Sequence, residues 1–183
     1  MQVSTLNELF VKELRDVYNA ERQLIRTLPT MAKKANSPDL TKAIEVHLEQ
    51  TQQQAKRLEQ AFELLDVSSR GPVCKGMKGI IDEGKESLEE MDEPDVTDAG
   101  IIMSAQKVEH YEIATYGSLC EYANVLGHSE IAGLLKTTLD EEKAADKKLS
   151  ELAERGINAM ATNGGGSDSE EKENGRSKNR RKR

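Results

Sequence analysis

The sequence predicts an all-α protein in which four long helices form a bundle. Apolar residues recur at helical spacing in four separate segments, and no segment shows the alternating pattern of a β-strand. Of the 183 residues, 36% are hydrophobic, 32% are charged and only 3% are aromatic, a composition that suits an all-helical protein. We therefore expect one helical domain over residues 1–161, followed by a C-terminal tail.

The first two helices are expected over residues 5–34 and 39–65, separated by the short break "ANSPD". Ser4 is a candidate N-cap for the first helix, and Ser37 or Asp39 for the second. The break is too short to hold an independent element. The two helices should therefore pack against each other as an antiparallel hairpin.

A second hairpin is expected over residues 99–125 and 130–155, with Gly156 as its C-cap. More than thirty residues connect the two hairpins, and a weaker helix is expected within this connection, over residues 75–91. Two hairpins joined by one long crossover give the connectivity of a ferritin-like four-helix bundle.

The two hairpins also show a faint internal repeat. When the first is displaced by 91 residues, four of its leucine or isoleucine positions fall on leucines of the second. Glu21 falls on Glu112 under the same displacement. The pattern is consistent with a duplicated hairpin, although short apolar matches also arise by chance.

Acidic residues occupy positions in the apolar stripes that should face the bundle interior. In the third long helix, Glu109 and Glu112 continue the three–four spacing of its apolar residues. Residues equidistant from the turn of an antiparallel hairpin lie side by side, so acids from three helices should share one layer. The complete set is Glu21, Glu109, Glu112, Glu142 and Asp146.

Carboxylates buried in one layer require compensation. Ionised groups in a low-dielectric interior are costly, and neighbouring carboxylates raise one another's pKa by repulsion. Carboxylate oxygens suit Mn, Fe, Mg or Ca ions, so the layer indicates a metal site. The alternative is that these acids lie on solvated helix faces and form i,i+4 pairs with lysine; five acids at one height favour the metal.

Four stretches of the sequence resemble the YciE/YciF-type family of bacterial stress proteins: "YNAERQL", "HLEQT", "AQKVEHYEIATYGSL" and "LDEEKAADKKL". The resemblance runs from about residue 6 to residue 152. It implies a ferritin-like fold related to rubrerythrins and manganese catalases, a centre of two Fe or Mn ions, and often a homodimer.

The resemblance assigns metal ligands to Glu21, to Glu109 and Glu112, and to Glu142 and Asp146 of the last long helix. The chain departs from the di-iron pattern because neither the second nor the fourth long helix carries Glu-x-x-His. The second reads "HLEQTQQQ", and the fourth has Ala145 at the histidine position. His47 is then the histidine with the best claim to the site, and redox catalysis is less well supported than metal binding.

The C-terminal segment over residues 162–183 contains seven basic and four acidic residues and almost no apolar ones. It is expected to be disordered, and its basic end could contact nucleic acid through counterion release. The chain shows no membrane-spanning apolar run and no secretory signal. Its two cysteines, Cys74 and Cys120, form no disulfide framework, so we expect a cytoplasmic protein.

Two functions remain open from the sequence. The first is a ferritin-like metal-binding protein of stress or oxidant response, in which Fe or Mn could react with peroxide or oxygen. The alternative is a non-enzymatic, dimeric helical module that binds DNA or a protein partner through its basic tail.

Overall fold

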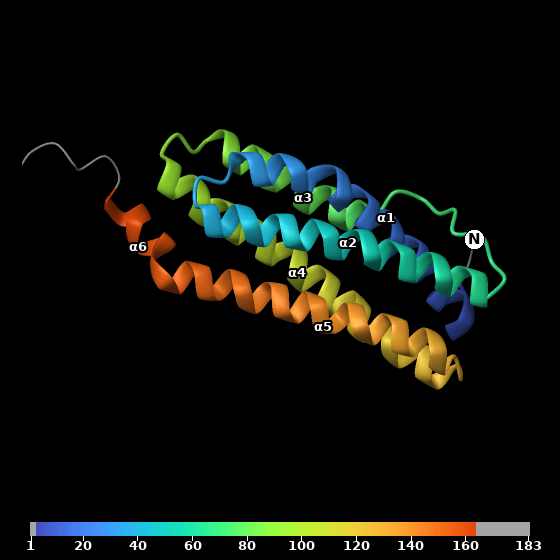
Figure 1. The fold of residues 1–183 in the computed structure, drawn as a ribbon. Helices are drawn as coiled ribbons and strands as arrows, with labels where there is room; N and C mark the ends of the chain where they lie inside the picture. Colours follow the sequence, from blue (N-terminus) through green and yellow to red (C-terminus); the bar gives the residue numbers. More distant parts are fainter. Residues whose placement is uncertain (1–2, 164–183) are drawn as a thin grey trace, which may run out of the picture.

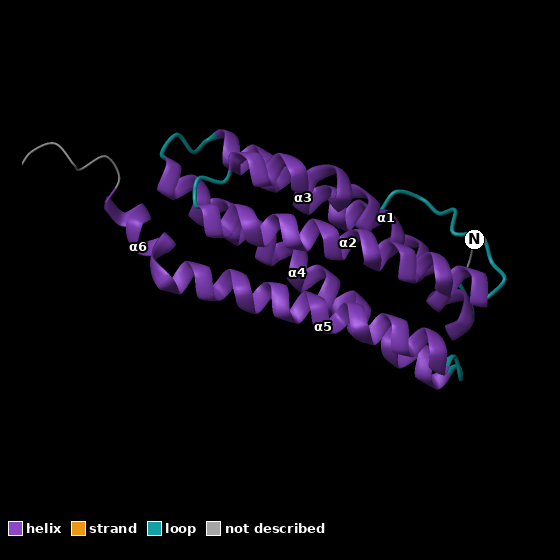
Figure 2. Cartoon of the chain, viewed as in Figure 1, coloured by secondary structure: helices purple, strands orange, loops and turns teal. Residues whose placement is uncertain are grey.

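The computed structural model describes residues 3–163, and its folded part is helical (Figures 1 and 2). The described residues contain no strand, and none of their helices combines the length and apolarity needed to cross a membrane. The predicted all-α class is confirmed. The helices are α1 (Leu6–Lys34), α2 (Pro38–Leu64), α3 (Lys75–Glu89), α4 (Pro94–Val125), α5 (Ser129–Leu152) and α6 (Asn158–Met160).

The four long helices pack as two antiparallel pairs, α1 with α2 and α4 with α5. The pairs meet through α2 against α5 and α1 against α4. The buried carboxylate of Asp98, near the start of α4, accepts the backbone N–H groups of Asn36 and Ser37, each at 2.7 Å. Because α4 thus begins beside the α1–α2 turn, α2 and α4 run parallel. Their connection must return along the bundle, and it contains α3, which packs on α4 and α1.

The starts of the first two helices test the predicted N-caps. Thr5, not Ser4, caps α1: its hydroxyl accepts the backbone N–H of Glu8 at 3.2 Å, and the Glu8 carboxylate reaches back to the N–H of Thr5. This reciprocal capping box satisfies two donors at once. The Ser4 prediction was wrong, since its hydroxyl donates to Glu8 instead. For α2, Ser37 is the cap, and it accepts the backbone N–H of Leu40 at 3.4 Å.

Two predicted helix ends were wrong. α4 begins at Pro94, five residues before the predicted residue 99, because proline is preorganised for the first helical position. α5 ends at Leu152, not residue 155, and Ala153 is its C-cap in place of Gly156. The chain then enters a π-helical turn, Ala153–Ile157, in which Gly156 has φ +147°. The predicted tail lies almost wholly outside the described residues.

The core consists of two apolar clusters with a polar layer between them. Along α1, Val17 belongs to one cluster and Leu24 to the other, and Glu21 lies between them. The same order holds on α5, where Glu142 lies between Leu139 and Leu149. Each long helix therefore places its central polar residues at one level. The buried polar residues of this level are Glu21, His47, Thr51, Gln54, Glu109, Glu112 and Glu142.

Candidate metal centre

Four buried side chains bring potential metal-ligating atoms together at this level. One ligand atom each from His47, Glu109, Glu112 and Glu142 lies within 4.8 Å of all the others. The imidazole Nε2 of His47 is 3.3 Å from Glu109 Oε1 and 4.0 Å from Glu142 Oε2. None of the four residues is more than 7% exposed. The predicted layer therefore contains a compact group of three carboxylates and one imidazole.

Helix geometry explains this convergence. Glu109 and Glu112 are three residues apart on α4, so they project from the same helical face. Glu142 faces them from α5, the antiparallel partner of α4. His47 comes from α2, which packs against α5. The group thus draws on three helices, and it forms only when the two hairpins are packed together.

Glu21 lies beside the group of four rather than in it. Its carboxylate, fully buried on α1, accepts a hydrogen bond from the hydroxyl of Tyr116. Tyr116 is itself fully buried on α4. Burial, followed by the charge of Glu142, raises the pKa of Glu21 well above its ordinary value. Glu21 is therefore an electrostatic neighbour of the group.

Asp146 lies outside the group of four. It is half-buried on α5, where its Oδ1 accepts a hydrogen bond of 3.4 Å from Gln106 Nε2 and lies 3.3 Å from His110 Nε2. The His110 side chain is 70% exposed. The structure thus brings Glu109, Glu112, Glu142 and His47 together and does not place Asp146 among them.

The carboxylates of the layer repel one another in a desolvated environment. Burial is the largest cause that raises the pKa of Glu112 well above its ordinary value, and the charges of Glu21, Glu142 and Glu109 add to it. The pKa of Glu109 is raised in the same way, by burial and then by Glu142. These groups need either protons or a cation to remain buried together.

Unpaired polar atoms concentrate in this layer. Among the described residues, eight buried side-chain oxygen and nitrogen atoms have no hydrogen-bond partner. Leaving such atoms unpaired costs roughly 1–3 kcal/mol each, and more for charged groups. They belong without exception to Glu21, His47, Gln54, Glu109, Glu112 and Glu142. An ion bound between these side chains would use several of the free lone pairs.

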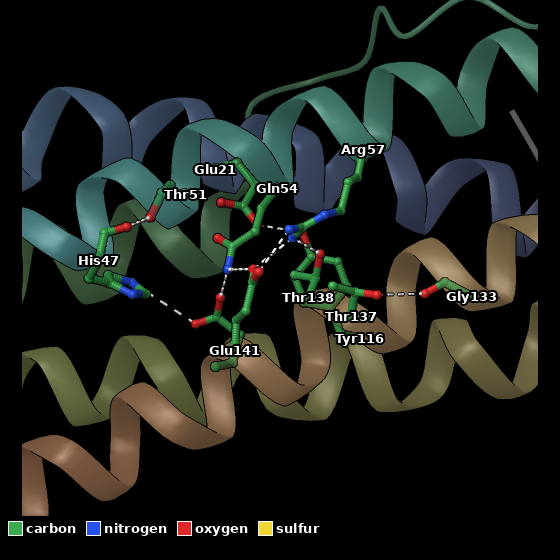
Figure 3. Close-up of polar contacts among 11 residues, drawn as sticks. Glu21, His47, Thr51, Gln54, Arg57, Tyr116, Gly133, Thr137, Thr138 and Glu141 are labelled. Carbon is green, nitrogen blue, oxygen red and sulfur yellow. Dashed lines mark hydrogen bonds and ion pairs between the residues drawn. The ribbon is translucent and has the colours of Figure 1, made fainter.

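Two polar residues of α2 complete the surroundings, as Figure 3 shows. The amide nitrogen of Gln54 donates to the Glu142 carboxylate and, at 3.2 Å, to Glu141 Oε2. Arg57 binds the Glu141 carboxylate with both terminal nitrogens, at 2.6 and 2.7 Å, and reaches Thr138 Oγ1 at 3.3 Å. The nearby cation is thus already paired with Glu141, an acid outside the layer.

The sequence offered only a partial signal for these residues. Gln54 lies in the stretch "HLEQTQQQ", which lacks the expected motif, and was given no role. Gln54 and Arg57 are three residues apart, which is the spacing of the absent Glu-x-x-His motif. Arg57 was missed because it approaches the layer from beside the apolar stripe, and a periodicity argument considers only the stripe itself.

Comparison with known proteins identifies the family. The family described as a domain of unknown function, DUF892, matches residues 5–162. This chain belongs to the DUF892 family. It is 42% identical to Protein YciF of Escherichia coli K12 over 164 residues, which cover 89% of this chain and 99% of that protein. The resemblance to YciF-type proteins is confirmed.

Two solved structures have the same fold as this chain. The crystal structure of the E. coli stress protein YciF matches with a TM-score of 0.82 and 41% identity, over 85% of this chain and 99% of that one. YcfI from Rhodopseudomonas palustris matches with a TM-score of 0.80 and 43% identity, over 81% and 95% of the two chains. The helical architecture is therefore shared with these two bacterial proteins.

Proposed function

We propose that this DUF892 protein is a ferritin-like metal-binding protein that holds Fe or Mn in its buried polar layer. The observation that carries the proposal is the group formed by His47, Glu109, Glu112 and Glu142, in the layer that holds the unpaired buried atoms. A mixture of carboxylate and imidazole ligands suits Fe and Mn. The four grouped residues would hold one ion, and Glu21, with the neighbouring carboxylates of the layer, would hold a second.

The fold supports a ferritin-like assignment. α2 and α4 run parallel and are joined by a long crossover, which is a connectivity of ferritin-like bundles. Such bundles commonly hold their metal between inward-facing glutamates of facing helices. The relative from E. coli is described as a stress protein, and we extend this role to the present chain. A bound Fe or Mn pair would supply redox chemistry toward peroxide or oxygen.

Neighbouring side chains would orient the ligands before an ion arrives. Tyr116 donates to Glu21 and Gln54 donates to Glu142, so one oxygen of each carboxylate is fixed while the other stays free. Such supporting contacts typically change metal affinity by about 10–100-fold. The clusters of Leu24 and Val17 on either side of the layer would exclude water from the centre.

Metal content of the protein purified without chelator tests the proposal directly. We expect bound Fe or Mn after incubation with Fe(II) or Mn(II), and a large loss in the Glu142→Gln variant, which keeps the shape and removes the charge. Glu49→Gln is the matched control, because Glu49 is exposed on α2. Full metal occupancy in Glu142→Gln, or none in the parent, would exclude this site.

The alternative function is a dimeric helical module that acts through its basic tail. A parent protein that binds no metal, together with DNA binding that disappears on deletion of residues 162–183, would favour it. Light scattering of the full chain would establish whether the proposed homodimer forms. Metal binding by the helical domain and DNA binding by the tail can therefore be tested in separate experiments.

A further inference from the structure

A cavity of about 390 Å³ lies next to the polar layer, along the part of α2 nearest the α1–α2 turn. Residues from all four long helices line it, and α2 and α5 contribute the exposed ones. Its volume lies toward the lower end of the range for small-ligand pockets, about 300–1000 Å³. Its inner wall is mainly apolar and includes Leu24, Leu28, Ile44, Val108 and Leu149.

The cavity exists because one half of the α2–α5 interface is built from small residues. Ala43 of α2 and the pair Ala144 and Ala145 of α5 line it. In the other half of this interface, the Arg57–Glu141 pair fills the space between the same helices. Long side chains therefore close the α2–α5 interface on one side of the polar layer, and small residues leave it open on the other side.

Charge is distributed unequally along the cavity. Lys42 and Lys148 line it and are exposed, so they lie at its opening, together with the carboxylate of Asp39. Lys42 also lies 3.9 Å from Glu45. At the inner end, Glu109 and His47 belong to the group of buried ligands. An anionic head group is therefore attracted at the opening and repelled at the inner end.

The lining also restricts the class of ligand. A sugar or a nucleotide needs many hydrogen-bonding partners, and the inner wall offers few beyond His47 and Glu109. An unbranched apolar chain needs none, and it would bury its surface against the leucines and the valine. The charges at the opening then require one anionic group at the end of the chain.

We propose that this cavity binds a free medium-chain carboxylate, with its chain inside and its head group at the opening near Lys42 and Lys148. The site adjoins the metal centre but needs no metal to bind this ligand. The proposal therefore goes beyond the metal function and stands or falls independently of it.

Calorimetric titration of metal-stripped protein in the presence of chelator tests the ligand class. Octanoate, decanoate and dodecanoate form the series, with decanol as the uncharged control. Burial of one methylene contributes about 0.8 kcal/mol, so each should tighten Kd about fourfold until the cavity is filled. Decanoate should bind more tightly than decanol. Absence of decanoate binding overturns the proposal, and equal binding of decanol overturns the assigned head group.

Two variants locate the ligand. Ala145→Leu fills the cavity and should weaken decanoate binding more than tenfold, whereas Ala114→Leu, on the exposed face of α4, should not. Undiminished binding in Ala145→Leu, with its helical circular dichroism intact, would place the ligand elsewhere and overturn the proposal.

The second variant tests the head group without disturbing the core. An exposed ion pair contributes about 0.2–1 kcal/mol, so Lys148→Gln should weaken decanoate binding about 1.4- to fivefold and leave decanol unaffected. Lys147→Gln is the control, because Lys147 is exposed and does not line the cavity. If decanoate binds only after Mn(II) is added, its carboxylate lies on the metal and the assigned orientation is wrong.

Discussion

The two hairpins of the bundle contribute unequally to the polar layer. The α4–α5 hairpin provides Glu109, Glu112 and Glu142, three of the four grouped ligands. The α1–α2 hairpin provides only His47 to that group, with Glu21 beside it. The acids therefore concentrate in one hairpin, although both have the same architecture.

The internal repeat shows which positions of the two hairpins differ in charge. Displacement by 91 residues places Thr51 at the position of Glu142, while Glu21 matches Glu112. The first hairpin thus has a neutral hydroxyl where the second has a carboxylate, and Gln54 adds a neutral amide that donates to Glu142. Neutral groups facing acids limit like-charge repulsion when no ion is bound. Through Gln54 the first hairpin therefore supports Glu142 of the second, whereas its own acid, Glu21, adds a charge that repels Glu112.

The largest expected effect comes from removing a carboxylate of the second hairpin. Glu112→Gln should lower metal affinity by more than about 100-fold, since a side chain that binds the ion directly matters more than the supporting contacts, which change affinity by about 10–100-fold. The metal-free variant should melt at a higher temperature than the parent, because one buried repulsive charge is gone. Metal titration and thermal denaturation measure the two effects.

Glu21→Gln is the equivalent substitution in the first hairpin, because Glu21 matches Glu112 in the internal repeat. This variant should lose the ion assigned to Glu21 and keep most of the ion held by the four grouped residues. The number of ions bound per chain should therefore fall, while the affinity for the remaining ion stays nearly unchanged. Equal loss in both variants would show that the hairpins contribute alike.

Adding a carboxylate to the first hairpin should have the next largest effect. Gln54→Glu keeps the size of the side chain, replaces a donor to Glu142 with a like charge, and should destabilise the metal-free protein. Added Mn(II) should then raise the melting temperature by more than it does in the parent. A melting temperature unchanged in chelator would show that Gln54 does not face the acids.

The pH dependence of the metal-free protein should reverse on metal binding. The folded-state pKa values of Glu21, Glu109 and Glu112 lie above the ordinary 4.5. The folded chain therefore binds protons that the unfolded chain has released, and stability should fall as pH rises above about 4.5 toward the folded-state pKa values. Thermal melts in chelator from about pH 5 to about pH 8 measure this decline.

Glu112→Gln should flatten that decline, since it removes one of the groups responsible. Bound metal should reverse it, because ligands bind an ion when deprotonated and the bound state then gains stability with pH. A metal-free parent that becomes more stable between about pH 5 and about pH 8 would contradict the buried-acid account.

The smallest effect is expected from Tyr116→Phe. This substitution removes the hydrogen bond to Glu21 and leaves a buried carboxylate oxygen unpaired, at a cost of roughly 1–3 kcal/mol. Metal affinity should fall by about tenfold, as for other supporting contacts. Tyr122→Phe, at a half-buried position on the same helix, is the control for loss of a hydroxyl.

Helical periodicity predicted much of this layer. The stripe of α4 placed Glu109 and Glu112 inside, and the distance from each turn placed Glu142 at the same height; all three are buried. These positions follow from regular helix geometry, which a sequence encodes locally. His47 was also named, although its helix lacked the expected motif.

The rest depends on contacts between distant segments. The role of Asp98 was not predicted, because its carboxylate accepts backbone N–H groups of the α1–α2 turn, about sixty residues away in the chain. The spacing of Asp146 along its helix placed it in the predicted layer. Its carboxylate accepts a hydrogen bond from Gln106 and lies outside the group of four ligands. Periodicity predicts which face of a helix is buried. It does not predict which partner a side chain at the edge of that face will bind, as with Asp146 and Arg57.

The division of the ligands between hairpins has a kinetic consequence. Each hairpin closes through contacts local in sequence, which form quickly, whereas the contacts between hairpins are long-range and form later. His47 lies in the first hairpin and its three partners lie in the second. High-affinity metal binding during refolding should therefore begin only when the two hairpins dock. It should lag behind the recovery of the helical circular dichroism signal, so that metal binding monitors the last assembly step.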